Sequence, residues 1–166
     1  SAALELSGTG LAREPGRSAT LLAAELARAA GRTVYLDLDF RADQWHDVRA
    51  YGVNVRALLP LVDVALGTVE EVNAAMLREA GDVVITHQQV SAPSVRGDVN
   101  TSIEALLSVP AGPEALVVKR GEKGATIHLR SGERIDAPGY PVEVVNVLGA
   151  GDAFAASRSV CPRQDS

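Results

Sequence analysis

The chain has 166 residues and a mass of 17.3 kDa, the size of one ordinary domain, and its 46% hydrophobic residues are enough to build a core. Its formal net charge is -5 and its isoelectric point is near 5.2. This acidic balance argues against nucleic acid and anionic membranes as partners, because both attract basic surfaces. The numbers favour a folded domain that acts on small molecules.

Cysteine content and hydropathy give two expectations about the protein's environment. Cys161 is the only cysteine, so no intrachain disulfide and no cysteine-rich zinc cluster is expected. Residues 1–6 lack the basic and apolar regions of a signal peptide, and no later segment approaches about 18 consecutive apolar residues. We therefore expect a cytoplasmic protein with no membrane partner.

Short β-branched runs alternate with alanine-rich helical stretches, a pattern that favours an α/β fold with a parallel sheet. The first helix is predicted from an N-cap at Ser18 to a stop at Gly31. Later in the chain, strands are predicted over 33–39 and 61–66. The apolar residues of this helix recur at helical spacing: Leu21, Leu22, Leu26 and Ala29.

A second helix is predicted after strand 61–66 and ends at Gly81. Its apolar face consists of Val69, Val72, Met76 and Leu77. The next segment, 82–100, is ambiguous: residues 83–86 fit either a strand or a helix tail, and the polar remainder fits a loop or an insertion.

The following elements are clearer. A short helix is predicted around 103–107, and the near-continuous apolar run 115–119 is typical of a strand buried on both faces. A glycine turn at 121–124 then leads into two shorter strands, 125–129 and 134–137.

A glycine loop, Asn146-Val147-Leu148-Gly149-Ala150-Gly151-Asp152, joins a strand to the last helix. Glycines let the backbone approach a ligand, and free N–H groups at a helix start can receive a phosphate. Asp152, in the first helical turn, would be held ionised by the helix dipole and could accept a proton from an attacking hydroxyl. An ordinary strand-to-helix turn with Asp152 as an N-terminal charge explains the same residues.

Two more segments combine polar groups with turns. Lys119 could meet a phosphate, with Gly121 and Gly124 permitting close backbone approach to a nucleotide, although a plain hairpin with solvated lysines fits as well. Thr68 and Glu71 open a helix with the spacing of a capping box, which is a purely structural alternative to a role for Glu71 at a metal and phosphate.

Asp37, Asp39 and Arg41 lie at the C-terminal end of a predicted strand, where open α/β sheets bind ligands. They alternate to one side, and a guanidinium suits a substrate carboxylate or a transferred phosphate. A charged strand end is the alternative. A weaker motif, 7–11 (Ser-Gly-Thr-Gly-Leu), lacks the third glycine of a dinucleotide fingerprint, and the phosphate-binding loop Gly-x-x-x-x-Gly-Lys-Ser/Thr does not occur.

Together these segments resemble the ribokinase-like (PfkB) kinases. The loop over 149–152 is similar to the family's signature, flanked by matching Asn146, Leu148, Ala153 and Phe154, and the four other sites follow in the family's order. The resemblance implies a ribokinase-like, three-layer, Rossmann-like α/β sheet with helices on both faces, truncated at both ends. It divides the chain into a partial kinase domain, 1–156, and an atypical tail, 157–166.

The resemblance also implies an ATP-dependent kinase that uses Mg²⁺ and phosphorylates a hydroxyl of a sugar or sugar acid. Asp152 is then the base, and amides of Gly149, Ala150 and Gly151 form the anion hole. The implied nucleotide-side residues are Lys119, Gly121, Gly124, Asn146, Thr68 and Glu71, with Glu71 near magnesium and Thr68 replacing the family's usual asparagine. The implied substrate-side residues are Asp37, Asp39 and Arg41.

The substrate-side residues look most like those of kinases acting on 5-dehydro-2-deoxygluconate in inositol catabolism. They are also similar to those of ketodeoxygluconate kinases and fructokinases, which stay open as alternatives. A truncated, non-catalytic nucleotide-binding module is a further alternative. A homodimer would need a surface other than the lid through which family members often pair.

Overall fold

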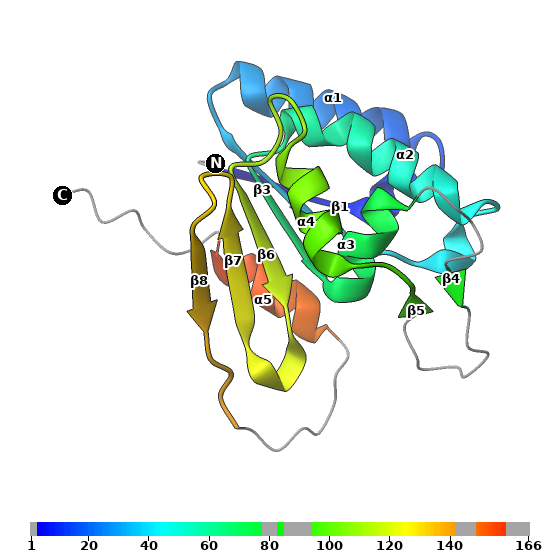
Figure 1. Ribbon diagram of the computed structural model, residues 1–166. Coiled ribbons are helices and arrows are strands. Elements are labelled where there is room, and N and C mark those ends of the chain that lie inside the picture. Colours follow the sequence, from blue (N-terminus) through cyan, green and yellow to red (C-terminus); the bar gives the residue numbers. More distant parts are fainter. Residues whose placement is uncertain (1–2, 78–82, 85–93, 142–148, 159–166) are drawn as a thin grey trace.

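The computed structural model describes residues 3–77, 83–84, 94–141 and 149–158 (Figure 1). Its strands are β1 (Ala3–Ser7), β2 (Thr33–Asp37), β3 (Val64–Thr68), β4 (Val83–Val84), β5 (Ser94–Val95), β6 (Ala115–Lys119), β7 (Ala125–Leu129) and β8 (Arg134–Ala137). Its α-helices are α1 (Gly16–Ala29), α2 (Val48–Leu58), α3 (Val69–Met76), α4 (Val99–Leu107) and α5 (Ala150–Arg158). None of the helices in these ranges is long and apolar enough to cross a membrane.

The main sheet has the strand order β1-β2-β3-β6-β7-β8. The first four strands are parallel, and β7 and β8 are added antiparallel. The reversal arises because short turns join β6, β7 and β8, whereas helices carry the chain between the parallel strands. The sheet is therefore parallel where the sequence alternates strands with helices, and mixed as a whole.

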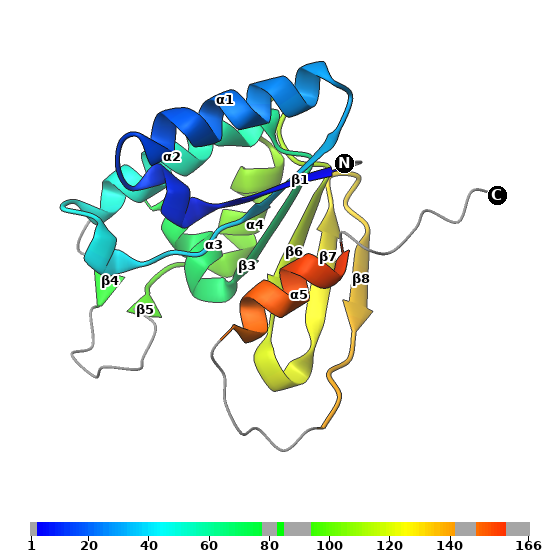
Figure 2. The same cartoon turned by 180° about the vertical axis from the view of Figure 1, so that it is seen from behind.

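Helices cover both faces of the sheet, as expected. On one face, the core joins Leu36 and Leu116 of the sheet to α1, α2, α3 and α4. On the other, Leu66 and Val117 pack with Phe154 of α5, which crosses in front of β6 and β7 when the sheet is seen from this side (Figure 2). The apolar residues of β6 before Lys119 follow from this arrangement, since the strand is covered on both sides.

The first helix begins earlier than predicted, so the N-cap at Ser18 is wrong. Helix α1 starts at Gly16 after Pro15, and Ser18 donates its backbone amide and its hydroxyl to the Glu14 carboxylate. Two of the predicted apolar positions also face outward: Leu22 is 55% exposed and Leu26 62% exposed.

Both predicted strands of the first half are shifted or shortened. Residues 59–61 form a 3₁₀ turn that contains Pro60, and β3 begins only at Val64. Strand β2 ends at Asp37 because Asp39 adopts a positive φ of 35°, which extended backbone does not allow.

Helix α2 was not predicted. Its buried residues Tyr51, Val55 and Leu58 have helical spacing, but Gly52 in the second turn weakens the pattern. The structure explains the glycine: a Cβ there would lie 3.0 Å from the carbonyl oxygens of Ala74 and Ala75, so Gly52 allows α2 to pack closely on the end of α3.

Candidate active site

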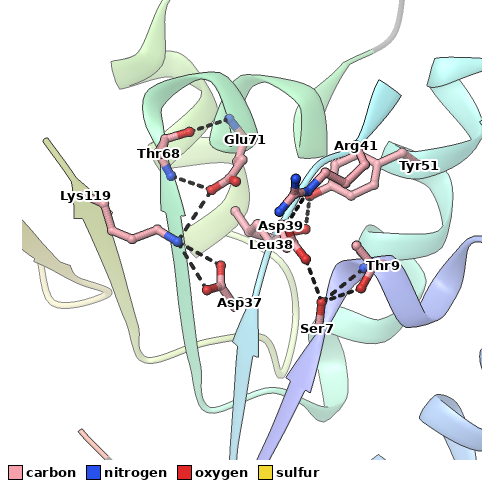
Figure 3. A network of polar contacts seen from close by, with 10 residues as sticks. All are labelled: Ser7, Thr9, Asp37, Leu38, Asp39, Arg41, Tyr51, Thr68, Glu71 and Lys119. Atoms are coloured by element: carbon pink, nitrogen blue, oxygen red, sulfur yellow. Dashed lines mark hydrogen bonds and ion pairs between the residues drawn. The ribbon is translucent and has the colours of Figure 1, made fainter. Parts of the chain in front are cut away.

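The C-terminal ends of the parallel strands bring distant polar residues to one edge of the sheet. Ser7 at the end of β1 is paired with Asp37 at the end of β2, and Thr68 at the end of β3 is paired with Lys119 at the end of β6. Because parallel strands end at the same edge, these side chains gather there although they lie far apart in sequence (Figure 3).

Lys119 lies between two carboxylates. Its Nζ is 3.0 and 3.2 Å from the two carboxylate oxygens of Asp37, and 3.8 Å from Oε2 of Glu71. The side chains are 15%, 9% and 17% exposed for Lys119, Asp37 and Glu71, so the ion pairs are largely screened from water. Buried charges of this kind need partners of opposite charge: Lys119 is the partner of both carboxylates.

Thr68 and Glu71 form the predicted capping box at the start of α3. The Thr68 amide donates to Oε2 of Glu71 at 2.7 Å, and the Glu71 amide donates to the Thr68 hydroxyl at 3.3 Å. Burial raises the pKa of Glu71 above its ordinary value, while Lys119 and the Thr68 amide pull that pKa down. The cap and the contact with Lys119 coexist, so the structural role of Glu71 does not exclude a chemical one.

Asp39 and Arg41 form a second group beside the first. Nε of Arg41 donates to Oδ1 of Asp39 at 2.9 Å, and the Ser7 hydroxyl donates to Oδ2 of Asp39 at 3.0 Å. Asp37 belongs to the Lys119 cluster instead, and β2 ends at this residue, so strand alternation does not extend to Asp39 and Arg41. The turn at Asp39 breaks the strand's period of two.

The glycine loop ends beside the Lys119 cluster. A Cβ built on Gly151, in the first turn of α5, would lie 3.7 Å from Nζ of Lys119. Gly149 has a φ of 77°, and both Gly149 and Ala150 are exposed. The first amides of a helix have no partner within it, so α5 presents donors close to the lysine. Asp152 lies in this first turn, but its side chain and all of Asn146 are outside the described part of the structure.

The two glycines of the β6–β7 turn differ in role. Gly124, with a φ of 86°, lies against residues 137–139, and a Cβ on it would come within 2.1 Å of the Ala137 carbonyl oxygen. Gly121, with a φ of 58°, has open space where a Cβ would be. Gly124 is thus explained by packing of the hairpin, whereas no packing contact explains the glycine at Gly121.

The cluster fits a magnesium ion that takes few ligands from the protein. Among the residues described by the structure, no group of three or more acidic, histidine or cysteine side chains could hold a metal by itself. Asp37 and Glu71 offer two carboxylates, and Mg²⁺ commonly binds through one or two carboxylates together with water and substrate phosphates.

The sequence analysis did not single out one residue of this region. Tyr51 is fully buried, and its hydroxyl donates to the Leu38 carbonyl oxygen at 2.7 Å. Burial raises the pKa of Tyr51 well above its usual value, which keeps the hydroxyl protonated as a donor. The apolar spacing of Tyr51, Val55 and Leu58 was the available signal, but Gly52 obscured it.

Comparison with known proteins decides the family. A model described as pfkB family carbohydrate kinase matches residues 1–160. The chain belongs to this family. Among curated members, the 5-dehydro-2-deoxygluconokinases of Shouchella clausii and Photobacterium profundum are 32% and 33% identical to it over 154 and 156 residues. The chain spans 42% and 41% of these two relatives, which cover 93% and 92% of the chain.

Solved structures of kinases have the same fold as this chain. A fructokinase from Vibrio cholerae, in fructose, ADP and calcium ion bound form, matches with a TM-score of 0.70 and 22% identity over 91% of this chain and 42% of its own. A putative ribokinase II from E. coli in complex with ATP and Mg²⁺ matches with a TM-score of 0.70 and 21% identity over 98% of this chain and 47% of its own. These likenesses confirm the ribokinase-like fold.

Proposed function

We propose that this chain carries the phosphoryl-transfer edge of an ATP-dependent kinase whose acceptor is a hydroxyl of a sugar or sugar acid. The observation that supports this most is the meeting of Lys119, Asp37 and Glu71 with the first turn of α5. A largely buried cation, two carboxylates and the amides at a helix start are the groups that bind phosphates and their magnesium ion.

Each group has a role in the proposed reaction. Magnesium ATP supplies the γ-phosphoryl group. Lys119 and the amides of Gly149, Ala150 and Gly151 stabilise charge on the phosphates, and Asp37 and Glu71 hold the ion. Asp152 takes the proton of the acceptor hydroxyl as its oxygen bonds to the γ-phosphorus. The bond between phosphorus and the β–γ bridging oxygen breaks, and its electron pair leaves with ADP.

The acceptor we propose is 5-dehydro-2-deoxygluconate. It is the substrate named in the curated relatives that match more than nine-tenths of the chain. Arg41, at the same edge of the sheet, is suited to the carboxylate of a sugar acid. Phosphorylation of 5-dehydro-2-deoxygluconate should therefore be faster than that of fructose, which has no carboxylate.

The role of Asp152 is tested by Asp152→Asn, with the exposed Glu104→Gln on α4 as the matched control. ADP formation should fall at least about 100-fold in Asp152→Asn, because a general base is removed, while the Kd for ATP and the control's turnover stay unchanged. Measurable turnover that is equal in Asp152→Asn and the unaltered chain would refute the assignment.

A non-catalytic nucleotide-binding module is the second candidate, because the chain spans only about two fifths of its curated relatives. The same assay separates the two. If the chain binds ATP but forms no ADP in the presence of any tested sugar or sugar acid, the result would support the module and exclude catalysis by this chain.

A further inference from the structure

Asp39 has an unusual backbone. Its φ of 35° lies in the left-handed region, which costs an ordinary residue about 1 kcal/mol and persists only where the surroundings hold it. Aspartate tolerates this region better than most residues, but nothing in the sequence of residues 37–41 requires it. The contacts around Asp39 supply the reason.

The Asp39 carboxylate is held from two sides. Oδ2 accepts from the Ser7 hydroxyl at 3.0 Å, and Oδ1 accepts from Nε of Arg41 at 2.9 Å (Figure 3). The Ser7 and Thr9 hydroxyl oxygens are 2.7 Å apart. Since Ser7 has one hydroxyl proton and gives it to Asp39, Thr9 is the donor in that pair. The end of β1 thus fixes the carboxylate to which Arg41 donates.

The backbone next to Asp39 is clamped as well. The Leu38 carbonyl oxygen accepts from the buried Tyr51 hydroxyl at 2.7 Å, and the Leu38 amide donates to the Leu66 carbonyl at 2.8 Å. Gly8 packs directly on this peptide, since a Cβ on it would lie 2.0 Å from the Leu38 oxygen. Any other residue at position 8 would push the two loops apart.

We infer that Ser7 is a positioning residue that orients Arg41 through Asp39, with Gly8 and Tyr51 fixing the intervening backbone. This assigns a function to the Ser-Gly-Thr-Gly motif, which has no place in the Lys119 cluster. Arg41 is 61% exposed at the edge where the acceptor would bind, so burial does not hold its side chain, and the bond to Asp39 contributes to its orientation. The ligand we infer for Arg41, the carboxylate of a sugar acid, rests on the proposed function; the positioning by Ser7 does not.

The test measures solvent exchange of the Arg41 Nε proton by ¹H–¹⁵N NMR on the 166-residue chain. The variants are Ser7→Ala, Ser7→Thr, and Ser131→Ala in the exposed β7–β8 turn as the control. Loss of the Ser7 hydrogen bond should speed exchange about three- to tenfold in Ser7→Ala, whereas the threonine hydroxyl should restore the slow rate. Ser131→Ala should leave it unchanged.

Two results would overturn the inference. One is equal exchange in Ser7→Ala and the unaltered chain. The other is an Arg41 proton that already exchanges as fast as that of exposed Arg13 in the unaltered chain. If Ser7→Ala does not fold, Tyr51→Phe replaces it: loss of its bond to Leu38 should also speed exchange, and an unchanged rate would count against the clamp.

Titration with D-gluconate and D-glucitol distinguishes this inference from the proposed substrate class. A shift of the Arg41 resonance with gluconate and not with glucitol supports carboxylate recognition, and that shift should weaken in Ser7→Ala. A gluconate response of equal strength in Ser7→Ala would overturn the positioning role. No response to gluconate, with the exchange difference present, would reject the sugar acid and retain the positioning role.

Discussion

At the scale of single residues, the candidate site depends on one ammonium group between two buried carboxylates. Removing it in Lys119→Met leaves Asp37 and Glu71 without their cation, which should lower the free energy of unfolding by about 3 kcal/mol. Urea denaturation measures this, with exposed Lys123→Met expected to change stability by less than about 0.5 kcal/mol. Equal losses in the two variants would mean that the Lys119 ion pairs carry no stability.

Glu71 makes a second residue-scale prediction, because burial raises its pKa. A carboxyl whose pKa is higher in the folded than in the unfolded state contributes stability below the unfolded value, and this is lost as pH rises through the folded value. The ordinary pKa of a glutamate is 4.5. In the absence of metal, the free energy of unfolding of Glu71→Gln minus that of the unaltered chain should therefore rise from pH 4.5 up to the raised pKa of Glu71. Urea denaturation across this range tests it, and a difference that falls with pH would contradict it.

At the scale of elements, the β6–β7 hairpin depends on a glycine that packs against backbone. Gly124 and Gly132 have similar φ values of 86° and 90°, but only at Gly124 does a Cβ meet another segment. Gly132→Ala should cost about 1 kcal/mol for the backbone conformation alone. Gly124→Ala should cost more than about 3 kcal/mol, because residues 137–139 must also move away. Similar losses by thermal denaturation would show that the hairpin has room at Gly124.

Elements with a strong local signal were predictable, and those shaped by tertiary contacts were not. Strand β6 and helix α4 lie where their apolar runs predict them. Helix α2 was missed because Gly52 meets the carbonyls of α3, and strand β2 ends early because Ser7 and Tyr51 hold the turn after it. In each case the cause is a contact with a distant segment, which local spacing does not reveal.

At the scale of the whole molecule, the two faces of the sheet are covered unequally. Leu116 is fully buried in the core shared by four helices, whereas Phe154 of α5 is half-buried against a small cluster. Leu116→Ala should cost about 3 kcal/mol, and Phe154→Ala less than about 2 kcal/mol. Urea denaturation compares them. A larger loss from Phe154→Ala would mean that α5 is as firmly fixed as the main core.

The candidate site follows from topology more than from any one motif. Lys119, Asp37 and Glu71 could each be singled out from the sequence, because each lies at the end of a strand or the start of a helix. Their ion pairs could not be predicted from the sequence, since Asp37 and Lys119 are separated by 82 residues and meet only through the strand order. Gly151 comes close to Lys119 because α5 packs on the face of the sheet opposite to the main core.

The central claim is that Lys119 and the first turn of α5 form one phosphate site. Its most direct test is the amide ¹H–¹⁵N spectrum of the labelled chain during titration with magnesium ATP. The largest shifts should fall on Gly149, Ala150, Gly151 and Lys119, with Gly31 at the far end of α1 unchanged. Shifts confined to other segments, or no shifts at all, would contradict the claim.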